Sequence, residues 1–325
     1  MTAIMLREAI SRGLVEALEE DERVFMIGED IGTFKGPYAV TSGMLDKFGP
    51  DRIIDSPISE SAMIGTAIGS ALGGLRPIVE IMTVNFLLLG MDQVVNHAAK
   101  LRYMSNGQIN VPMVIRTVTG GGSQLGATHS QCLEVWFATV PGLKVAVPSD
   151  PYDALGLLRT SIEDEDPVLF AEHSLLYRVK GEVPDTPYKI PFGQAKIKRI
   201  GSDITLVAYS RMVHVAMEAA EILADKGIEA EIVDLRTLRP IDHDTVLESV
   251  KKTNRAIVIE EFWRTGGMSA EIASTIQEEA FDYLDGPVGR VGGLEVPAPY
   301  NGTLEAATLP TAEKIVESIN KLYRI

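Results

Sequence analysis

The chain alternates short apolar runs with helical patterns, and this alternation constrains the fold more than any other feature of the sequence. Apolar residues recur at helical spacing between Leu6 and Leu18, and the run VFMIGED that follows is typical of a buried strand with a polar end. Five more strand patterns are each separated by helical patterns: RIID at 52–55, PIVEIM at 77–82, VPMVIRT at 111–117, LKVAVP at 143–148 and PVLFAE at 167–172. Strands joined through helices pair in parallel, so the sequence predicts an α/β fold with a mainly parallel sheet.

A second alternating region follows a proline-rich break. Residues 177–192 contain three prolines and mixed charges, which is typical of a linker. Four strand patterns come after it, DITLVAYS, AEIVDLR, RAIVIEE and PVGRVGG, with helical patterns near 212–226, 243–252, 268–283 and 311–322. A length of 325 residues also fits two domains of roughly 150 residues each. We predict a first domain at 1–185, a linker at 186–200 and a smaller α/β domain at 201–325.

Charge and cysteine content exclude several classes of function. A net charge of −15 disfavours binding to phosphate backbones and to anionic lipid surfaces. The single cysteine, Cys132, excludes an internal disulfide framework and fits a reducing compartment. The first 20 residues contain acids and read as a mature amphipathic helix rather than a targeting peptide. We therefore expect a cytoplasmic protein without nucleic-acid or membrane partners.

Two glycine-rich segments lack the context of a nucleotide site. In GTAIGSALGG, Gly65, Gly69 and Gly73 are four residues apart on one helical face, unlike the strand-linked G-x-G-x-x-G of dinucleotide sites. Small residues at this spacing allow another backbone to approach closely, either at a subunit interface or within the domain. The run Gly120–Gly122 is not followed by Lys-Ser or Lys-Thr, so a phosphate-binding P-loop is unsupported.

Three candidate site residues follow predicted strands, where open parallel sheets bind ligands. Glu60 begins an apolar helix after RIIDSPIS, a position that favours a carboxylate but that an ordinary helix-start glutamate also occupies. Phe86 is either a core aromatic or part of a site. His129 lies in the polar, glycine-rich loop TGGGSQLGATHSQC, where it could act as acid, base or donor or could simply orient the loop.

Co-ordered motifs along nearly the whole chain resemble the beta subunits of 2-oxo acid dehydrogenases, the decarboxylating components of lipoyl-linked complexes. The motifs are GEDIG at 28–32, KFGPDRIIDSPISES at 47–61, NF at 85–86, QLGATHSQ at 124–131, PGLKVAVPS at 141–149, VDLRTLRPID at 233–242 and EEFWRTGGMSAEI at 260–272. The resemblance implies a transketolase-like pyrimidine-binding domain followed by a transketolase C-terminal-like domain. It also implies an α2β2 heterotetramer with an alpha subunit, with thiamine diphosphate at the interface between subunits.

The resemblance assigns a role to each matching residue. Glu60 matches the glutamate that hydrogen-bonds the cofactor's aminopyrimidine ring, and Glu29 matches the glutamate of the GED motif near the cofactor. Phe86 matches the aromatic residue that packs against the pyrimidine, with Ile58 and Met82 completing that shell. His129 matches the histidine implicated in proton transfer and in handing the acyl group to lipoamide.

The signatures that bind the other end of the cofactor are missing. No GDG followed by paired asparagines occurs in the sequence, so the diphosphate and its magnesium are expected to be held by the alpha subunit. Some family members also hold potassium through backbone oxygens, which here would be the carbonyls of Ile162, Asp164 and Asp166. Each active site would then be completed by the partner subunit.

Three functional readings follow from these residues. The first is oxidative decarboxylation of a 2-oxo acid with acyl transfer to lipoamide on a dihydrolipoamide acyltransferase core. Pyruvate is favoured over acetoin and branched-chain 2-oxo acids by RTGG at 264–267 and DYLDGPV at 282–288. The second is a catalytically silent scaffold, which intact Glu60 and His129 disfavour. The third is a dinucleotide oxidoreductase, which the missing fingerprint disfavours.

Overall fold

The chain divides into two compact units that are interleaved in sequence. The first consists of residues 1–119 and 136–192, and the second of residues 120–135 and 193–325. The structure, a computed structural model, describes residues 1–324. It groups 120–135 with the second unit, whereas the predicted first domain spans 1–185; the domain boundaries stay a prediction.

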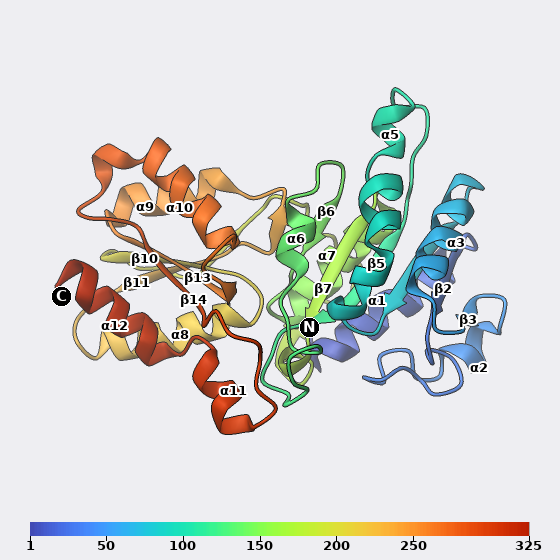
Figure 1. The fold of residues 1–325 in the computed structure, drawn as a ribbon, viewed down its shortest axis with the longest axis horizontal. Coiled ribbons are helices and arrows are strands. Elements are labelled where there is room, and N and C mark those ends of the chain that lie inside the picture. Colours follow the sequence, from blue (N-terminus) through green and yellow to red (C-terminus); the bar gives the residue numbers. More distant parts are fainter. Residues whose placement is uncertain (325) are drawn as a thin grey trace. The chain divides into compact units, whose positions relative to one another are not determined.

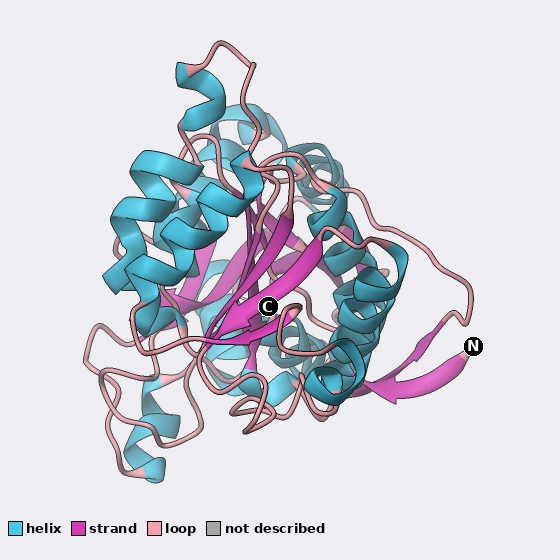
Figure 2. Cartoon of the chain, turned by 90° about the vertical axis from the view of Figure 1, so that its right-hand side faces the viewer, coloured by secondary structure: helices cyan, strands magenta, loops and turns pink. Residues whose placement is uncertain are grey.

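A parallel sheet with the strand order β6-β7-β5-β4-β2-β3 forms the centre of the first unit (Figure 1). Its strands are β2 (Val24–Gly28), β3 (Ile53–Asp55), β4 (Arg76–Ile81), β5 (Val114–Thr119), β6 (Lys144–Ala146) and β7 (Val168–His173). The helical segments are α1 (Leu6–Glu20), α2 (Met44–Phe48), α3 (Glu60–Leu72), α4 (Val84–Leu87), η1 (Leu88–Gly90), η2 (Gln93–Ala98), α5 (Leu101–Met104), α7 (Pro151–Glu163) and η3 (Ser174–Leu176). The predicted mainly parallel sheet is confirmed, and helices lie on both sides of the strands (Figure 2).

Helix α1 shows why the apolar spacing produces this packing. Its buried stripe includes Leu6, Ile10 and Leu14, each at most 1% exposed. A Cβ at Gly13 would lie 3.0 Å from Leu155 of α7, so the glycine lets the two helices approach closely. Burying such side chains against the sheet is the main stabilising contribution to this layer.

The second unit has a five-stranded sheet with the order β14-β13-β10-β11-β9, in which β9 is antiparallel to β11 and the other pairs are parallel. Its strands are β9 (Lys196–Arg199), β10 (Ile204–Ala208), β11 (Ala230–Asp234), β13 (Ala256–Trp263) and β14 (Gly289–Gly293); β12 (Thr237–Arg239) is a short additional strand. Its helices are α8 (Arg211–Ala224), α9 (His243–Thr253), α10 (Met268–Glu279), η4 (Phe281–Tyr283), α11 (Gly302–Thr308) and α12 (Ala312–Tyr323). Short α6 (Glu134–Ala138) follows the segment 120–133.

Each strand predicted from an apolar run is present, but several other elements were not expected. Strand β1 (Thr2–Met5) pairs antiparallel with β8 (Lys180–Val183), which lies in the stretch interpreted as a linker. Strand β9 lies within the predicted linker 186–200. Strands β8 and β9 carry charged residues, β1 has only four residues, and all three strands are partly exposed, so they lack the apolar signal of a buried strand.

The glycine-spaced helix α3 leaves part of its surface open. Gly69 and Gly73 are exposed, and a Cβ at Gly69 would meet no atom within 4 Å in the described part of the chain beyond the adjacent turns of α3. Gly65 is partly buried, and its nearest neighbour would be Gln93 at 3.5 Å. Close packing within the unit therefore does not explain Gly69, and the alternative of a subunit contact stays a prediction.

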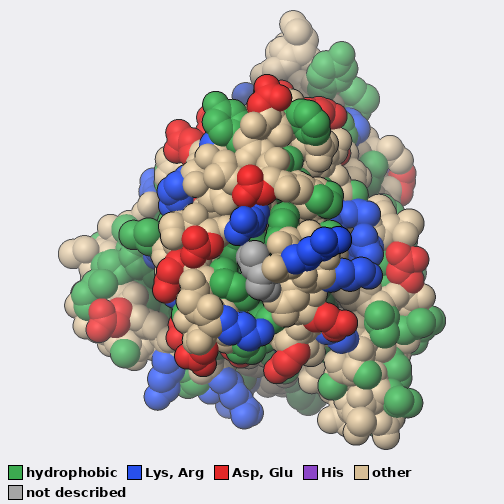
Figure 3. All heavy atoms as spheres, turned by 90° about the vertical axis from the view of Figure 1, so that its left-hand side faces the viewer, with side chains coloured by type: hydrophobic (Ala, Val, Ile, Leu, Met, Phe, Trp, Pro, Cys, Tyr) green, Lys and Arg blue, Asp and Glu red, His purple; other side chains and the backbone are tan. Residues whose placement is uncertain are grey.

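The surface carries charges of both signs. Figure 3 shows that basic and acidic side chains are interspersed over the face seen from the left of Figure 1. Among residues 1–324, no helix is both long enough and apolar enough to cross a membrane.

Candidate functional site

The candidate site lies at the carboxyl edge of the first sheet, because three adjacent parallel strands end there in register. Gly28 at the end of β2 pairs with Asp55 of β3 and with Glu80 of β4. The segments that leave these strands carry the predicted residues: Glu29 directly after β2, Ile58 and Glu60 after β3, and Met82 and Phe86 after β4. Parallel pairing therefore brings residues distant in sequence to one edge of one sheet.

Glu60 is the first residue of α3, as the sequence predicts, and its side chain is buried. It is 5% exposed and follows Ser59 in the N-cap position. A Cβ at Gly90 would come within 2.3 Å of Ile64 and 3.4 Å of the Glu60 carbonyl oxygen, so a glycine is needed where η1 crosses the start of α3. The backbone of Glu60 is thus held at a helix start, where the dipole favours negative charge.

Glu29 is partly buried, and its Oε1 is a buried atom without a hydrogen-bond partner among residues 1–324. Burial raises the pKa of Glu29 above its ordinary value, and the nearby charges of Glu60 and Asp30 raise it further. The two glutamates therefore lie close enough to influence each other. A buried carboxyl oxygen without a partner is a position where a donor from a bound group would be accepted.

Asp55 orders the segment that follows β2, a role that the sequence analysis missed. Its carboxylate accepts hydrogen bonds from the backbone N–H groups of Gly32 at 2.6 Å and Thr33 at 2.9 Å. Burial acts to raise the pKa of Asp55, but these N–H groups outweigh burial and hold it below its usual value. An acid at the polar end of the RIID strand was the available signal.

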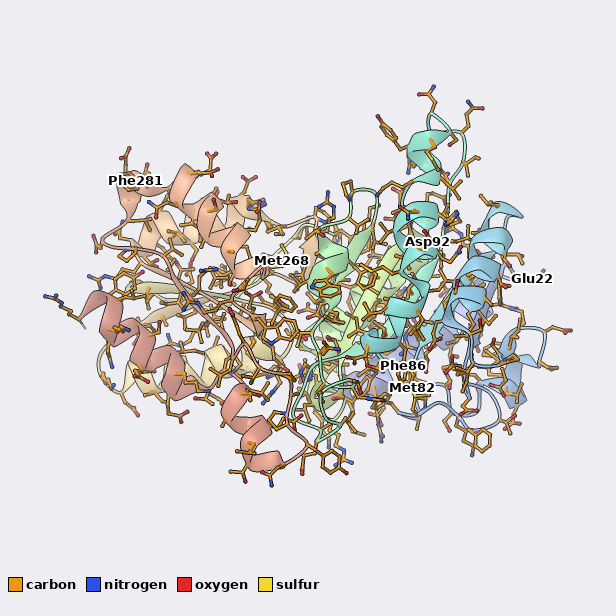
Figure 4. All side chains as sticks on the ribbon, viewed as in Figure 1. Glu22, Met82, Phe86, Asp92, Met268 and Phe281 are labelled. Atoms are coloured by element: carbon orange, nitrogen blue, oxygen red, sulfur yellow. The ribbon has the colours of Figure 1, made fainter. Side chains whose placement is uncertain are left out.

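The apolar candidates differ in exposure. Phe86, on α4, and Met82, directly after β4, are partly buried and come from the same end of the sheet (Figure 4). Ile58 is 81% exposed. The side chain of Thr83 caps α4 by accepting from the N–H of Asn85 at 3.5 Å, and this fixes the turn between Met82 and Phe86.

His129 belongs to the second unit, on the loop that follows β5. Its side chain is exposed, and its Nδ1 lies 2.9 Å from Oγ1 of Thr128. A hydrogen bond of 3.3 Å from the N–H of Gly120 to the carbonyl of Gln131 closes the loop at its base. The segment between these residues contains neither helix nor strand. We call residues 120–131 the His129 loop.

The His129 loop forms one wall of a pocket of about 410 Å³ within the second unit. Buried acids lie on its other side: Glu261 of β13 accepts from the N–H of Gly121 at 2.7 Å. Burial raises the pKa of the Cys132 thiol well above its ordinary value, and the charges of Glu261 and other glutamates raise it further. This cysteine is therefore a buried, unreactive thiol.

The three carbonyls predicted to bind potassium lie at the end of α7. Arg76 donates from Nη1 to the carbonyl oxygens of Ile162 at 3.0 Å and Asp164 at 3.1 Å. The side chains of Asp164 and Asp166 pair with Lys144 at 2.7 and 3.4 Å. A guanidinium thus supplies positive charge beside two of the predicted ligands, and potassium binding stays a prediction. Within residues 1–324, no group of three or more His, Cys, Asp or Glu residues is placed to hold a metal ion.

Comparison with known proteins identifies the family. The family model described as transketolase, pyrimidine binding domain matches residues 2–180, and the model described as transketolase, C-terminal domain matches residues 193–315. The pyruvate dehydrogenase E1 component subunit beta-2, mitochondrial, of Oryza sativa subsp. japonica is 47% identical over 97% of this chain and 85% of its own. The pyruvate dehydrogenase E1 component subunit beta of Rickettsia felis is 46% identical over 98% of both chains. The chain belongs to the pyruvate dehydrogenase E1 beta family.

The fold of this E1 beta family member is shared with transketolases. A solved chain described as a split gene transketolase, inactive beta4 tetramer, superposes with a TM-score of 0.80 at 25% identity and covers 98% of each chain. The predicted pair of transketolase-like α/β domains is therefore confirmed. The roles of Glu29, Glu60 and His129 within the E1 beta fold stay predictions.

Proposed function

We propose that this chain acts with an alpha subunit in the oxidative decarboxylation of pyruvate and the transfer of the acetyl group to lipoamide. The position of Glu29 and Glu60 at one edge of the first sheet carries the proposal. These two acids interact, Oε1 of Glu29 is buried and unsatisfied, and Phe86 follows the neighbouring strand at the same edge. Relatives at 43–47% identity over nearly the whole chain bear the name pyruvate dehydrogenase E1 beta.

The residues at this edge suit the aminopyrimidine ring of thiamine diphosphate. When bound, that cofactor supplies the carbon nucleophile that adds to the 2-oxo acid. Glu60 would hold a proton at the pyrimidine nitrogen and thereby set the ring's tautomer. Glu29 would accept a hydrogen bond through its unsatisfied Oε1. Phe86, with Met82 and Ile58, would cover the ring and exclude water.

The diphosphate end of the cofactor is assigned to the alpha subunit. The chain lacks the GDG signature, and we propose that alpha brings the ligands of magnesium. The exposure of Ile58 supports a site that a second subunit completes, since a side chain of the proposed apolar shell is 81% exposed in the isolated chain. Potassium near Ile162, Asp164 and Asp166, and a cytoplasmic location, belong to the same proposal.

His129 is assigned to the second half-reaction. Its exposed ring on a loop is accessible to a lipoyl group carried by an acyltransferase core, and an imidazole can move a proton near neutral pH. Replacing it with alanine should therefore slow acylation of a lipoyl domain more than it slows decarboxylation. An unchanged acylation rate would assign His129 to loop structure alone.

The test is reconstitution with the alpha subunit. Thiamine-dependent reduction of an artificial electron acceptor should be fastest with pyruvate when 2-oxobutyrate, branched-chain 2-oxo acids and acetoin are compared. Glu60→Gln should slow exchange of the cofactor's thiazolium proton by at least about tenfold, with the assembly intact. The chain alone should bind thiamine diphosphate weakly by calorimetry. Tight binding and turnover without alpha would overturn the half-site assignment.

The proposed α2β2 assembly gives the open face of α3 a role. Leucine at Gly69 would add bulk where another backbone is expected, and overpacking typically costs about 1–3 kcal/mol. Sedimentation should show a weakened heterotetramer. Among residues 1–324, no atom outside the surrounding turns of α3 lies within 4 Å of a Cβ at Gly69, so the isolated subunit should fold normally. A normal heterotetramer would remove α3 from the interface.

A further inference from the structure

The His129 loop has an unusual backbone. Four alternate residues have positive φ angles: Gly120 at 91°, Gly122 at 91°, Gln124 at 56° and Gly126 at 78°. Alternation of this kind turns successive N–H groups toward one side, and such concave runs of N–H groups bind anions. The loop is therefore built to surround a negative charge.

The anion comes from the same chain. Glu305 of α11 accepts hydrogen bonds from the N–H of Gly122 at 3.0 Å through Oε1 and from the N–H of Gln124 at 2.9 Å through Oε2. Its side chain is buried, at 2% exposure. Glu261 of β13 accepts from the N–H of Gly121 at 2.7 Å. Two carboxylates thus hold three N–H groups within four residues.

Helix α11 lies beside the loop (Figure 1), and further close contacts reinforce the attachment. A Cβ at Gly302, the first residue of α11, would lie 2.8 Å from the side chain of Gln124, so a glycine permits the contact. A Cβ at Gly126 would lie 3.7 Å from the ring of Tyr300. Gly126 in turn accepts from the N–H of His129 at 3.3 Å, which links the attached part of the loop to the histidine.

We propose that Glu305, assisted by Glu261, is a positioning residue for His129. This inference rests on the proposed role of His129 in acyl transfer, and it identifies the residues that hold His129 in position. The loop has no helix or strand of its own, so the position of its backbone depends on the carboxylate contacts. Thr128, whose Oγ1 lies 2.9 Å from Nδ1 of His129, then orients the ring on that backbone. A small displacement of a group that transfers protons lowers the rate steeply, by as much as about a hundredfold for 1 Å.

Glu305→Gln tests the proposal in the reconstituted heterotetramer. The amide keeps the length of the side chain but replaces one acceptor oxygen by a donor and removes the charge. Acylation of a lipoyl domain should fall at least about tenfold, while pyruvate-dependent reduction of an artificial acceptor stays within about twofold of wild type. The loss should appear in kcat of the acylation, while KM for the lipoyl domain stays unchanged. Glu295→Gln is the matched control, because Glu295 lines the same pocket but accepts from Thr265 at 3.2 Å.

A double-mutant cycle separates this proposal from the role of His129. In a His129→Ala background, Glu305→Gln should slow acylation no further, because its effect passes through the histidine. Amide hydrogen exchange of the peptide 120–131 should accelerate in Glu305→Gln, whatever the effect of His129→Ala. If His129→Ala leaves acylation unchanged, the role of His129 is overturned, but faster exchange would still support the attachment of the loop. Equal slowing in both backgrounds, or unchanged exchange and acylation, would overturn the positioning role. Glu261 accepts from one N–H group of the loop, whereas Glu305 accepts from two, so Glu261→Gln should give the same pattern with a smaller loss.

Discussion

The two units neutralise buried acids in different ways. In the first, Arg116 of β5 lies between strands β4 and β7 and bonds Glu80 at 2.5 Å and Glu172 at 2.7 and 2.9 Å. In the second, Glu260 of β13 is bonded by Ser269 and approached by the hydroxyl of Tyr209 at 3.4 Å. The first cluster contains a cation, and the second depends on neutral donors.

The difference appears in the pKa values. Burial opposes the charge of Arg116, but the two carboxylates outweigh burial and raise the pKa of the guanidinium, so Arg116 stays protonated at any ordinary pH. Burial raises the pKa of Glu260 to about 7, although the hydrogen bonds from Ser269 act in the opposite direction. The buried Glu260 of the second unit therefore titrates near neutral pH, whereas the buried Arg116 of the first unit stays positively charged.

Removing the cation should have the largest effect. Arg116→Met leaves Glu80 and Glu172 buried without their cation, and breaking a buried ion pair typically costs about 3–5 kcal/mol. The free energy of unfolding, measured with urea, should fall by that amount. Arg102→Met is the control: this arginine is exposed and pairs with Asp166 at 2.7 Å, so its loss should stay below about 1 kcal/mol. Equal losses would show that burial of the pair does not matter.

The second prediction concerns pH. Because folding raises the pKa of Glu260, the folded state binds this proton more tightly, and the stabilisation is complete below about pH 4.5 and lost as pH rises through about 7. As the pH rises from 5 to 8, ionisation of Glu260 should lower the free energy of unfolding by up to about 3 kcal/mol. Glu260→Gln should flatten that slope in urea titrations at several pH values. An unchanged slope would assign the pH dependence to other groups.

The smallest effect is expected for Glu80→Gln. The amide oxygen can still accept from Arg116, and the guanidinium keeps both bonds to Glu172. Burial also raises the pKa of Glu80, despite the opposing charge of Arg116, so removing its charge relieves a desolvation penalty. The free energy of unfolding should change by less than about 1 kcal/mol. A loss as large as that of Arg116→Met would mean that both carboxylates are needed.

The apolar strands and the place of Glu60 could be predicted because burial and helix starts leave side-chain patterns. The grouping of the His129 loop with the second unit could not be predicted, because the loop makes its contacts through backbone N–H groups, which almost every residue carries. Glu305 gave no signal either, because α11 is a seven-residue helix without an extended apolar stripe. The glycines at 120, 122 and 126 were the visible trace, but a glycine-rich run does not by itself indicate an anion-binding backbone, because that depends on the φ angles.

The interleaving of the two units sets the order in which contacts can form while the chain is synthesised. Residues 120–135 are synthesised about 170 residues before Glu305, the acid that holds them, and β1 must wait for β8 before it can pair. Neither unit is a continuous piece of polypeptide. A fragment that ends at residue 192 would carry the His129 loop without its carboxylates, so cutting the gene between the two family domains should leave that loop exposed to proteases.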